Sequence, residues 1–262
     1  MNPLQNRKSL LPHQPRRLRT VAKITLAFIL CVFSFLMLRL TLPYLALQND
    51  TAFLQLKQSV VGNPVWKVCF YIHVFTSIFL LAAGFTQFSA LIFCRAPQVH
   101  RQIGRFYIGI ILGLSGPASL VMSLFANGGW SSRIAFTSLS LLWMYVTYRA
   151  FETAREKKFA LHSAFMFRSF ALTLSALTLR AWKYILVLSF ALPPMDAYRT
   201  VAWLGWIPNL LVAEWLIRND VHLRLLQTFK ALAAQQSRMD SPQHAHILPA
   251  SPPEISNEDV EK

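Results

Sequence analysis

Long apolar runs alternate with short polar segments along this chain, and they restrict its fold more than any other feature. The runs cover residues 21–42, 68–93, 106–126, 134–148, 162–191 and 201–217. Most are about as long as a bilayer requires. Only helices satisfy their own backbone hydrogen bonds inside a single lipid-exposed segment. The pattern therefore predicts an all-α, polytopic membrane helix bundle with six transmembrane helices.

Composition agrees with this interpretation and opposes a soluble fold. Hydrophobic residues make up 54% of the 262 positions and charged residues only 14%. The fourth run is short for a span, but Arg133 and Arg149 flank it and can extend their charged ends to the membrane surfaces. The bilayer itself is thus the first expected partner.

The net charge of +15 reports on topology. Lys and Arg cluster in the N-terminal tail, in the 94–105 and 149–162 segments and after residue 217, whereas the alternate loops hold few. Cytoplasmic loops carry such an excess. Both termini are therefore predicted to be cytoplasmic, and nucleic-acid binding is not expected, because the basic residues lie between apolar runs.

Three regions follow from this pattern. Residues 1–20 form a basic cytoplasmic tail, residues 21–217 the six-span membrane domain, and residues 218–262 a second cytoplasmic tail. The last region turns Gln-, Ser- and Pro-rich and ends acidic, which predicts disorder from about residue 233. The first run is followed by Arg39 and Pro43 and lacks a small-residue cleavage site, so we interpret it as an uncleaved span.

Residues 162–191 carry polar side chains that a lipid-facing helix would not need. At helical spacing they fall on one face: His162, Met166, Ser169, Thr173, Ala176 and Arg180. In the 68–93 run, His73, Ser77, Gly84 and Gln87 form a second such stripe. We expect the second and fifth spans to face each other along a polar seam.

Ionisable groups at membrane depth are costly and indicate function by default. Arg180 and His73 are predicted at similar depths in the outer leaflet. Together with Gln87 they form the predicted site for a small anionic or carbonyl-bearing ligand. A histidine that only hydrogen-bonds between helices is the competing interpretation.

A second polar group is expected towards the cytoplasmic side. Glu214 is the one acid well inside a predicted span, and Arg168 lies at a similar depth, so the two are predicted to pair. His162 and His100 complete this predicted inner polar network. We expect a structural role for it, since the sequence has no nucleotide-binding loop, nucleophile elbow or HExxH motif, and an enzymatic activity is not indicated.

Cofactor binding has little support in the sequence. The cysteines Cys31, Cys69 and Cys94 are separated too widely for a Cys-x-x-Cys motif, and no metal site is predicted. Two histidines on facing helices would be needed to hold haem b. His100, His162 and His222 all lie at cytoplasmic ends of spans, so they are the candidate ligands for a haem on that side.

Several groups of residues resemble a known family. They are His73 with Gly84, Phe85 and Gln87; His100-Arg101-x-x-Gly104-Arg105-x-Tyr107; Gly116-Pro117; Phe136 with Trp143; His162-x-x-x-Met166-x-Arg168-Ser169-x-Ala171-Leu172-Thr173 with Leu179-Arg180; and Trp206-x-Pro208-Asn209-Leu210-x-x-Ala213-Glu214. In this order, over about residues 68–217, they resemble the predicted multi-pass membrane family called domain of unknown function 2306. The resemblance implies a bacterial-type inner or plasma membrane protein and no particular activity.

Three functions remain open from the sequence. The first is a ligand-binding or transport-type bundle with a polar seam between spans two and five. The second is a transmembrane redox protein linked to haem or a quinone. The third is a structural membrane partner without chemistry of its own. The sequence does not indicate the ligand or the oligomeric state.

Overall fold

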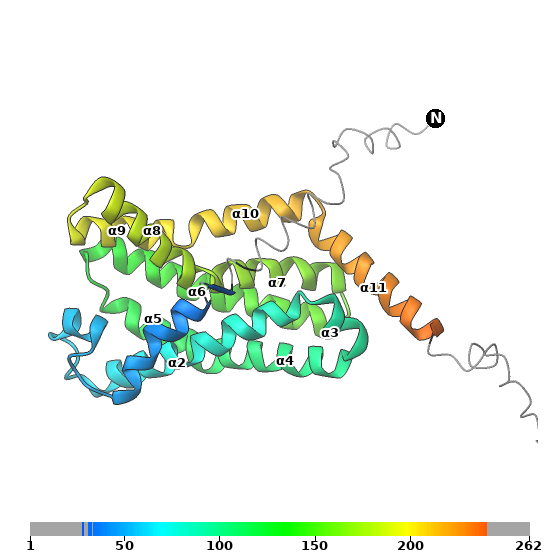
Figure 1. Ribbon diagram of the computed structural model, residues 1–262, viewed down its shortest axis with the longest axis horizontal. Helices are drawn as coiled ribbons and strands as arrows, with labels where there is room; N and C mark the ends of the chain where they lie inside the picture. The colour runs from blue at the N-terminus through cyan, green and yellow to red at the C-terminus, as the bar shows by residue number, and fades with distance from the viewer. Residues whose placement is uncertain (1–27, 29–30, 33, 240–262) are drawn as a thin grey trace, which may run out of the picture.

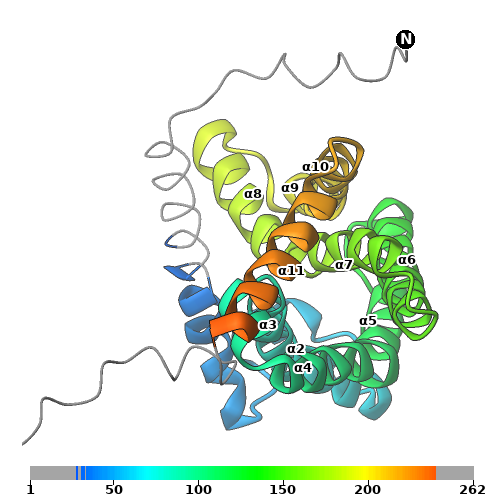
Figure 2. The ribbon, with the colours of Figure 1, turned by 90° about the vertical axis from the view of Figure 1, so that its right-hand side faces the viewer.

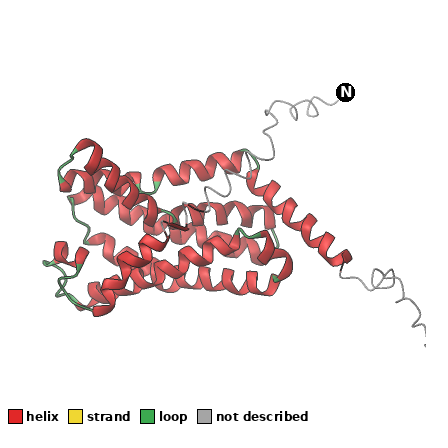
Figure 3. Ribbon diagram, in the orientation of Figure 1, coloured by secondary structure: helices red, strands yellow, loops and turns green. Residues whose placement is uncertain are grey.

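The chain folds into a helix bundle in which most of the long helices run along one axis. The computed structural model describes residue 28, residues 31–32 and residues 34–239 (Figure 1). No strand occurs among them (Figure 3). The α-helices are α2 (Pro64–Gln87), α3 (Ala90–Arg95), α4 (Pro97–Ile110), α5 (Gly116–Leu124), α6 (Gly129–Arg155), α7 (Phe159–Thr173), α8 (Ser175–Phe190), α9 (Pro194–Leu204), α10 (Ile207–Arg218) and α11 (Val221–Met239). Short 3₁₀ helices cover Leu42–Ala46 and Ala52–Lys57.

Three helical segments are long and apolar enough to cross a membrane. They are Pro64–Gln87, Pro97–Leu124 and Pro194–Arg218, and the bent pair α7–α8 makes a fourth if it counts as one span. These segments correspond to four of the six predicted spans. The other two differ: α6 spans 27 residues but is more polar, and the apolar helix Ser34–Ala46 is shorter. Residues 21–27 of the first predicted span lie outside the described residues.

Local sequence signals explain where the helices begin. The side chain of Asn63 caps α2 by accepting hydrogen bonds from the backbone N–H groups of Val65 and Trp66, at 3.0 and 3.2 Å. Proline stands in the first turn of α2, α4, α5, α9 and α10, where its missing N–H costs nothing. The turn before α6 places Gly128 and Gly129 at φ values of 84° and 77°, which glycine adopts without strain.

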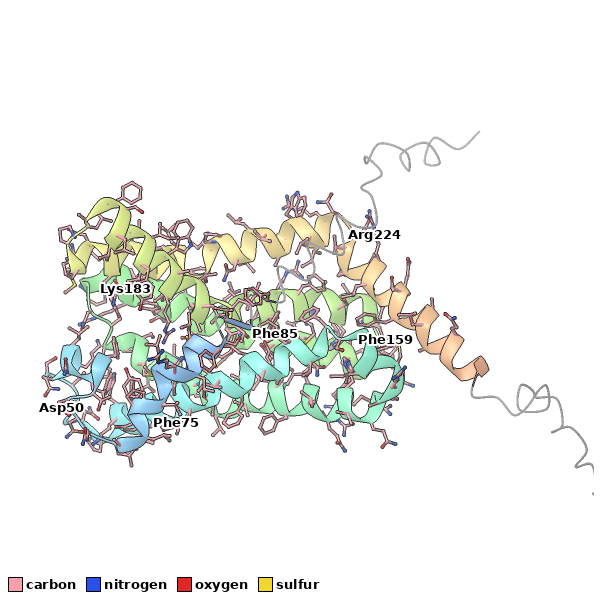
Figure 4. The ribbon with its side chains drawn as sticks, in the orientation of Figure 1. Asp50, Phe75, Phe85, Phe159, Lys183 and Arg224 are labelled. Carbon is pink, nitrogen blue, oxygen red and sulfur yellow. The ribbon has the colours of Figure 1, made fainter. Side chains whose placement is uncertain are left out.

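The bundle has two ends that differ in their connections. The Asn127–Gly129 turn and Asp50 lie at one end, which we call the Asn127 end, and α3 and α11 lie at the other, which we call the α11 end (Figures 1 and 4). Between them, α2, α4–α5, α6 and α7 pack around a core that includes the fully buried side chains of Leu80, Tyr107, Ile111 and Leu172. The core thus fixes how these helices align at both ends.

The break between α7 and α8 lies close to the break between α9 and α10, and side chains near them bond the backbone carbonyl groups that the breaks leave free. The pair α7–α8 bends by 40° at Leu174 without a proline or glycine. The amide of Asn209 in α10 donates to the carbonyl of Ala171, at 3.1 Å, and to that of Gly205, at 3.3 Å, where α9 ends. Thr178 also donates to the Gly205 carbonyl, at 2.5 Å. Non-helical backbone at membrane depth needs such partners from the protein.

A π-helical turn over Ile111–Ser115 joins α4 to α5. It closes with a hydrogen bond from the Gly116 N–H to the Ile111 carbonyl. A Cβ on Gly116 would lie 2.4 Å from that carbonyl oxygen and 2.6 Å from Met144, so only glycine fits. Turns of this kind occur frequently at functional sites.

The helix α11 crosses the α11 end of the bundle and contacts α3, α7 and α10 (Figure 2). It runs to Met239, past residue 233, where the sequence predicts disorder. The inward spacing of Leu225, Leu226, Phe229 and Ala233 continues the helical pattern and explains the difference. Residues 240–262 lie outside the described residues.

Candidate functional site

A cavity of about 740 Å³ opens at the α11 end. Its walls come from the end of α2, from α3 and α4, from the last turns of α6, from the first turns of α7 and from α11. Phe159, which lines it, lies at that end of the bundle in Figure 4. The volume falls within the range of small-molecule sites in proteins.

The cavity combines aromatic walls with a basic rim. Six phenylalanines line it: Phe88, Phe93, Phe151, Phe159, Phe167 and Phe229. Four cationic side chains join them, and all four are exposed: Arg101, Arg105, Arg155 and Lys230. No acidic residue is among the described side chains of the lining. The cavity therefore favours a ligand with an apolar body and a negative charge.

Two half-buried histidines face this cavity from different helices. Nδ1 of His162 in α7 lies 2.8 Å from the carbonyl oxygen of Ala150. Because a carbonyl oxygen can only accept a hydrogen bond, Nδ1 carries the proton and donates it. His100 of α4 packs edge-on against Phe93, with ring centroids 5.3 Å apart. Its Nδ1 is buried and has no hydrogen-bond partner in the described part of the chain.

Gln87 also lines the cavity, where α2 ends. Its amide oxygen lies so close to Gly104 that a Cβ there would be 3.0 Å from it. The amide nitrogen is buried and makes no hydrogen bond to any described residue. A buried donor without a partner is costly, and an oxygen atom of a ligand would satisfy it.

The third histidine of the predicted haem set lies outside the cavity. His222, at the start of α11, is buried with its ring 6.3 Å from that of Phe167. Burial lowers the pKa of its imidazole, Asp220 opposes this shift, and the positive charge of Arg168 adds to it. Of His100, His162 and His222, the structure thus places the first two on one cavity.

Arg168 and Glu214, which the sequence predicts to pair, form a bidentate ion pair between α7 and α10. Arg168 Nε lies 2.5 Å from Glu214 Oε1, and Nη2 lies 2.9 Å from Oε2. The guanidinium also lies over the ring of Phe165, 5.2 Å from its centroid. Neither residue lines the cavity, so the predicted inner network divides into this pair and the two cavity histidines.

His73 and Arg180 lie away from the cavity. The His73 ring reaches the π-helical turn, with Nδ1 3.2 Å from the carbonyl oxygen and 3.1 Å from the hydroxyl oxygen of Ser115. Arg180 donates to the carbonyl of Ala176 in its own helix, at 2.7 Å. No hydrogen bond joins the two among residues 34–239. A ligand site at His73 and Arg180 stays a prediction, and Gln87 belongs to the cavity instead.

The helix α11 and the phenylalanines belong to the site although no motif in the sequence marks them. The spacing of Leu225, Leu226 and Phe229 was a usable signal, because an amphipathic helix after the last span needs a surface on which to pack. The basic residues of the 94–105 and 149–162 segments indicate the membrane topology in the sequence. Three of them, Arg101, Arg105 and Arg155, also form the rim.

Comparison with known proteins places the chain in a family without assigning an activity. The sequence model described as "Predicted membrane protein (DUF2306)" matches residues 70–217, more than half of the chain. The matched region holds α4, α6 and α7, with both cavity histidines, as well as the Arg168–Glu214 pair. Neither the curated proteins nor the solved structures contain a significant match. The chain belongs to the DUF2306 family of predicted membrane proteins.

Proposed function

We propose that this membrane protein binds an amphipathic anion in the cavity at its α11 end. The observation that supports this most directly is that six phenylalanines and four cationic side chains line the same cavity. The apolar body of such a ligand would lie between the rings, and its carboxylate or phosphate would meet the rim. Charge-assisted hydrogen bonds to Arg are among the strongest available there.

A purely structural bundle would leave several of these features without a purpose. Buried polar atoms are normally paired, yet the Gln87 amide nitrogen and His100 Nδ1 have no partner in the described chain. Both belong to residues that line the cavity. A bound ligand accounts for the Gln87 amide and for the open volume together.

The proposal includes the membrane topology. We place six spans in a bacterial-type plasma membrane, with residues 1–20 and 218–262 both cytoplasmic. The exposed arginines and lysine of the rim support this orientation, since basic residues concentrate on the cytoplasmic side. The ligand would then enter from the cytoplasm or the inner leaflet. Fusion of green fluorescent protein or alkaline phosphatase after residue 262 tests the orientation: fluorescence without phosphatase activity is expected.

Photolabelling tests the ligand site. The full chain in proteoliposomes is exposed to a palmitate analogue that carries a diazirine and an alkyne, and labelled peptides are identified by mass spectrometry. We expect labelling of α7 and α11 near Met166 and Leu226, which line the cavity. Excess palmitate should suppress it, and the alkyl amine of the same length should not, because the rim is cationic.

A pair of variants separates the rim from general basicity. Arg101→Gln/Arg105→Gln should lose most of the labelling. Arg218→Gln/Arg224→Gln removes the same charge at the same end from residues outside the cavity and should retain it; Arg224 is seen on the exposed side of α11 in Figure 4. Labelling that is spread over the lipid-facing helices, or equal for acid and amine, would refute the proposal.

A further inference from the structure

Two histidines on one apolar cavity suggest a more specific ligand than a fatty acid. The inference rests on the proposed function, because it uses the same cavity. His100 comes from the first turn of α4 and His162 from the first turn of α7, 62 residues further along the chain. An acyl chain with a carboxylate would use the walls and the rim but would leave both imidazoles without a role.

His162 is held as metal-ligating histidines are held. Its Nδ1–H donates to the carbonyl of Ala150 in α6, at 2.8 Å. This bond fixes the tautomer and leaves the lone pair on Nε2 free to coordinate a metal. A hydrogen bond from the second ring nitrogen to a backbone carbonyl is the usual arrangement around metal-bound histidine. Nε2 makes no hydrogen bond within residues 34–239.

His100 offers the second imidazole. Phe93 holds the ring in place, and neither ring nitrogen bonds a described residue. Its Nδ1 atom is buried, so it has lost hydration without gaining a protein partner, which costs free energy. An iron atom bound at Nδ1 would offset that cost directly.

The surroundings distinguish between a bare metal ion and a metal that brings its own ligands. No group of three His, Cys, Asp or Glu side chains that could hold an ion exists in the described part of the chain. Haem needs only one or two protein ligands, because four pyrrole nitrogens already hold the iron. Its macrocycle is flat and apolar, and its two propionates are anionic.

We propose that the cavity binds haem b, with His100 and His162 as the axial ligands of the iron. The phenylalanine walls then contact the macrocycle. Phe167 lies on α7, as His162 does, and Phe93 packs against the ring of His100. The propionates meet two or more of the cations Arg101, Arg105, Arg155 and Lys230 at the rim. Each chemical part of haem thus has a counterpart in this cavity.

Reconstitution with haemin tests the inference. The full chain, purified in detergent, is titrated with haemin and its absorption spectrum recorded before and after reduction with dithionite. One haem per chain is expected, with the sharp Soret band and the narrow α band of six-coordinate, low-spin iron. The electron paramagnetic resonance spectrum of the oxidised wild type should show low-spin iron with two imidazole ligands, a measurement that needs no variant.

Single substitutions identify the ligands. His100→Ala and His162→Ala should each abolish the low-spin spectrum, whereas His73→Ala and His222→Ala should retain it, because these histidines do not line the cavity. If the alanine variants fail to fold, His100→Met and His162→Met keep the bulk and supply a thioether ligand. The iron should then stay low-spin, but its electron paramagnetic resonance spectrum should no longer be that of two imidazole ligands. A wild type without a Soret band, or spectra unaffected by changes at His100 and His162, would overturn the inference.

The palmitate analogue separates this inference from the proposed function. If haemin does not bind while the analogue still labels the cavity, only the haem inference fails. If neither binds, both fail. If both hold, haemin should compete with the analogue, and the labelling should survive His100→Ala and His162→Ala, because a fatty acid needs the walls and the rim but not the imidazoles.

Discussion

Arg168 of α7 and Glu214 of α10 form a bidentate ion pair, with N–O distances of 2.5 and 2.9 Å. The side chains are 23% and 33% exposed, so the pair is partly withdrawn from the surface. It ties the first half of the bent pair α7–α8 to the last apolar helix. We infer that this bond fixes the relative position of α7, which carries His162, and α10.

Breaking this ion pair should destabilise the bundle. Glu214→Leu leaves the guanidinium of Arg168 without its anion, and we expect a loss of about 1–3 kcal/mol, between the values for exposed and fully buried pairs. Thermal unfolding in detergent, followed by tryptophan fluorescence, measures it. Asp196→Asn breaks the more exposed Arg199–Asp196 pair and should have a smaller effect.

A double variant shows whether the charge or the packing is responsible. Arg168→Met/Glu214→Leu removes both charges and should be more stable than Glu214→Leu alone, because no unpaired charge remains. If the loss of stability in the double variant equals the sum of the losses in Arg168→Met and Glu214→Leu alone, the ion pair does not couple these helices.

Asn209 should be needed for the two meeting helix breaks. Its amide donates to the carbonyls of Ala171 and Gly205 and to the Thr178 hydroxyl. Asn209→Leu keeps the number of side-chain heavy atoms and removes the donors, so we expect a loss of about 1–3 kcal/mol and a lower melting temperature. Asn219→Leu, at an exposed position where the amide bonds only its own helix, is the matched control. Equal melting temperatures for the two variants would contradict the role of Asn209.

Glycine should be required at position 116 but not at 113. A methyl group on Gly116 would meet Ile111 and Met144 at 2.4 and 2.6 Å, whereas one on Gly113 would meet nothing within 4 Å. We expect Gly116→Ala to lower the stability by about 1–3 kcal/mol. Gly113→Ala should be neutral or raise it by up to about 1 kcal/mol, because alanine favours helix. Comparable unfolding of both variants would show that the π-helical turn tolerates a side chain.

Lys57 should make the stability depend on alkaline pH. It is 3% exposed, and its amine donates to the Phe125 carbonyl and to Asn127 Oδ1. Burial, with a contribution from Arg133, lowers its pKa from 10.5 to about 8. Between these values the unfolded chain binds the proton and the folded chain does not, so the free energy of unfolding rises with pH. Below pH 8 both states are protonated and this gain is absent.

Melting temperatures at pH 7 and pH 10 test the effect. The stability of the wild type should increase over this interval relative to Lys57→Met, which cannot titrate. Lys57→Arg stays charged throughout and should behave like Lys57→Met in its pH dependence. A difference between wild type and Lys57→Met that is the same at both pH values would contradict the lowered pKa.

The sequence predicts the helical class and several contacts because both depend on strong local constraints. Apolar runs of bilayer length must become helices, and α2, α4–α5 and α9–α10 match three of them. The contact between Arg168 and Glu214 could be predicted from the sequence, because a charge at membrane depth needs a partner and Glu214 is the one acid within the predicted spans. The break at Leu174 could not, since neither proline nor glycine marks it.

The predicted ligand site shows where periodicity is insufficient. His73 and Gln87 share a face of α2, but fourteen residues of helix separate them by about 21 Å. The structure places His73 against Ser115 and Gln87 on the cavity. A shared helical face indicates which neighbours a side chain meets, and it does not bring distant turns into one site.

The helical, apolar character of the chain follows from its sequence alone, since the 3.6-residue period and the length of each run are local properties. The cavity, by contrast, depends on how distant helices pack against one another. His100, His162 and Gln87 lie on three helices, and the walls include α11, which no span pattern required. Their meeting depends on the packing of the core around Tyr107 and Leu172 and on the angle at which α11 crosses the bundle. These are sums of many weak contacts between distant residues, and no segment of the sequence encodes them alone.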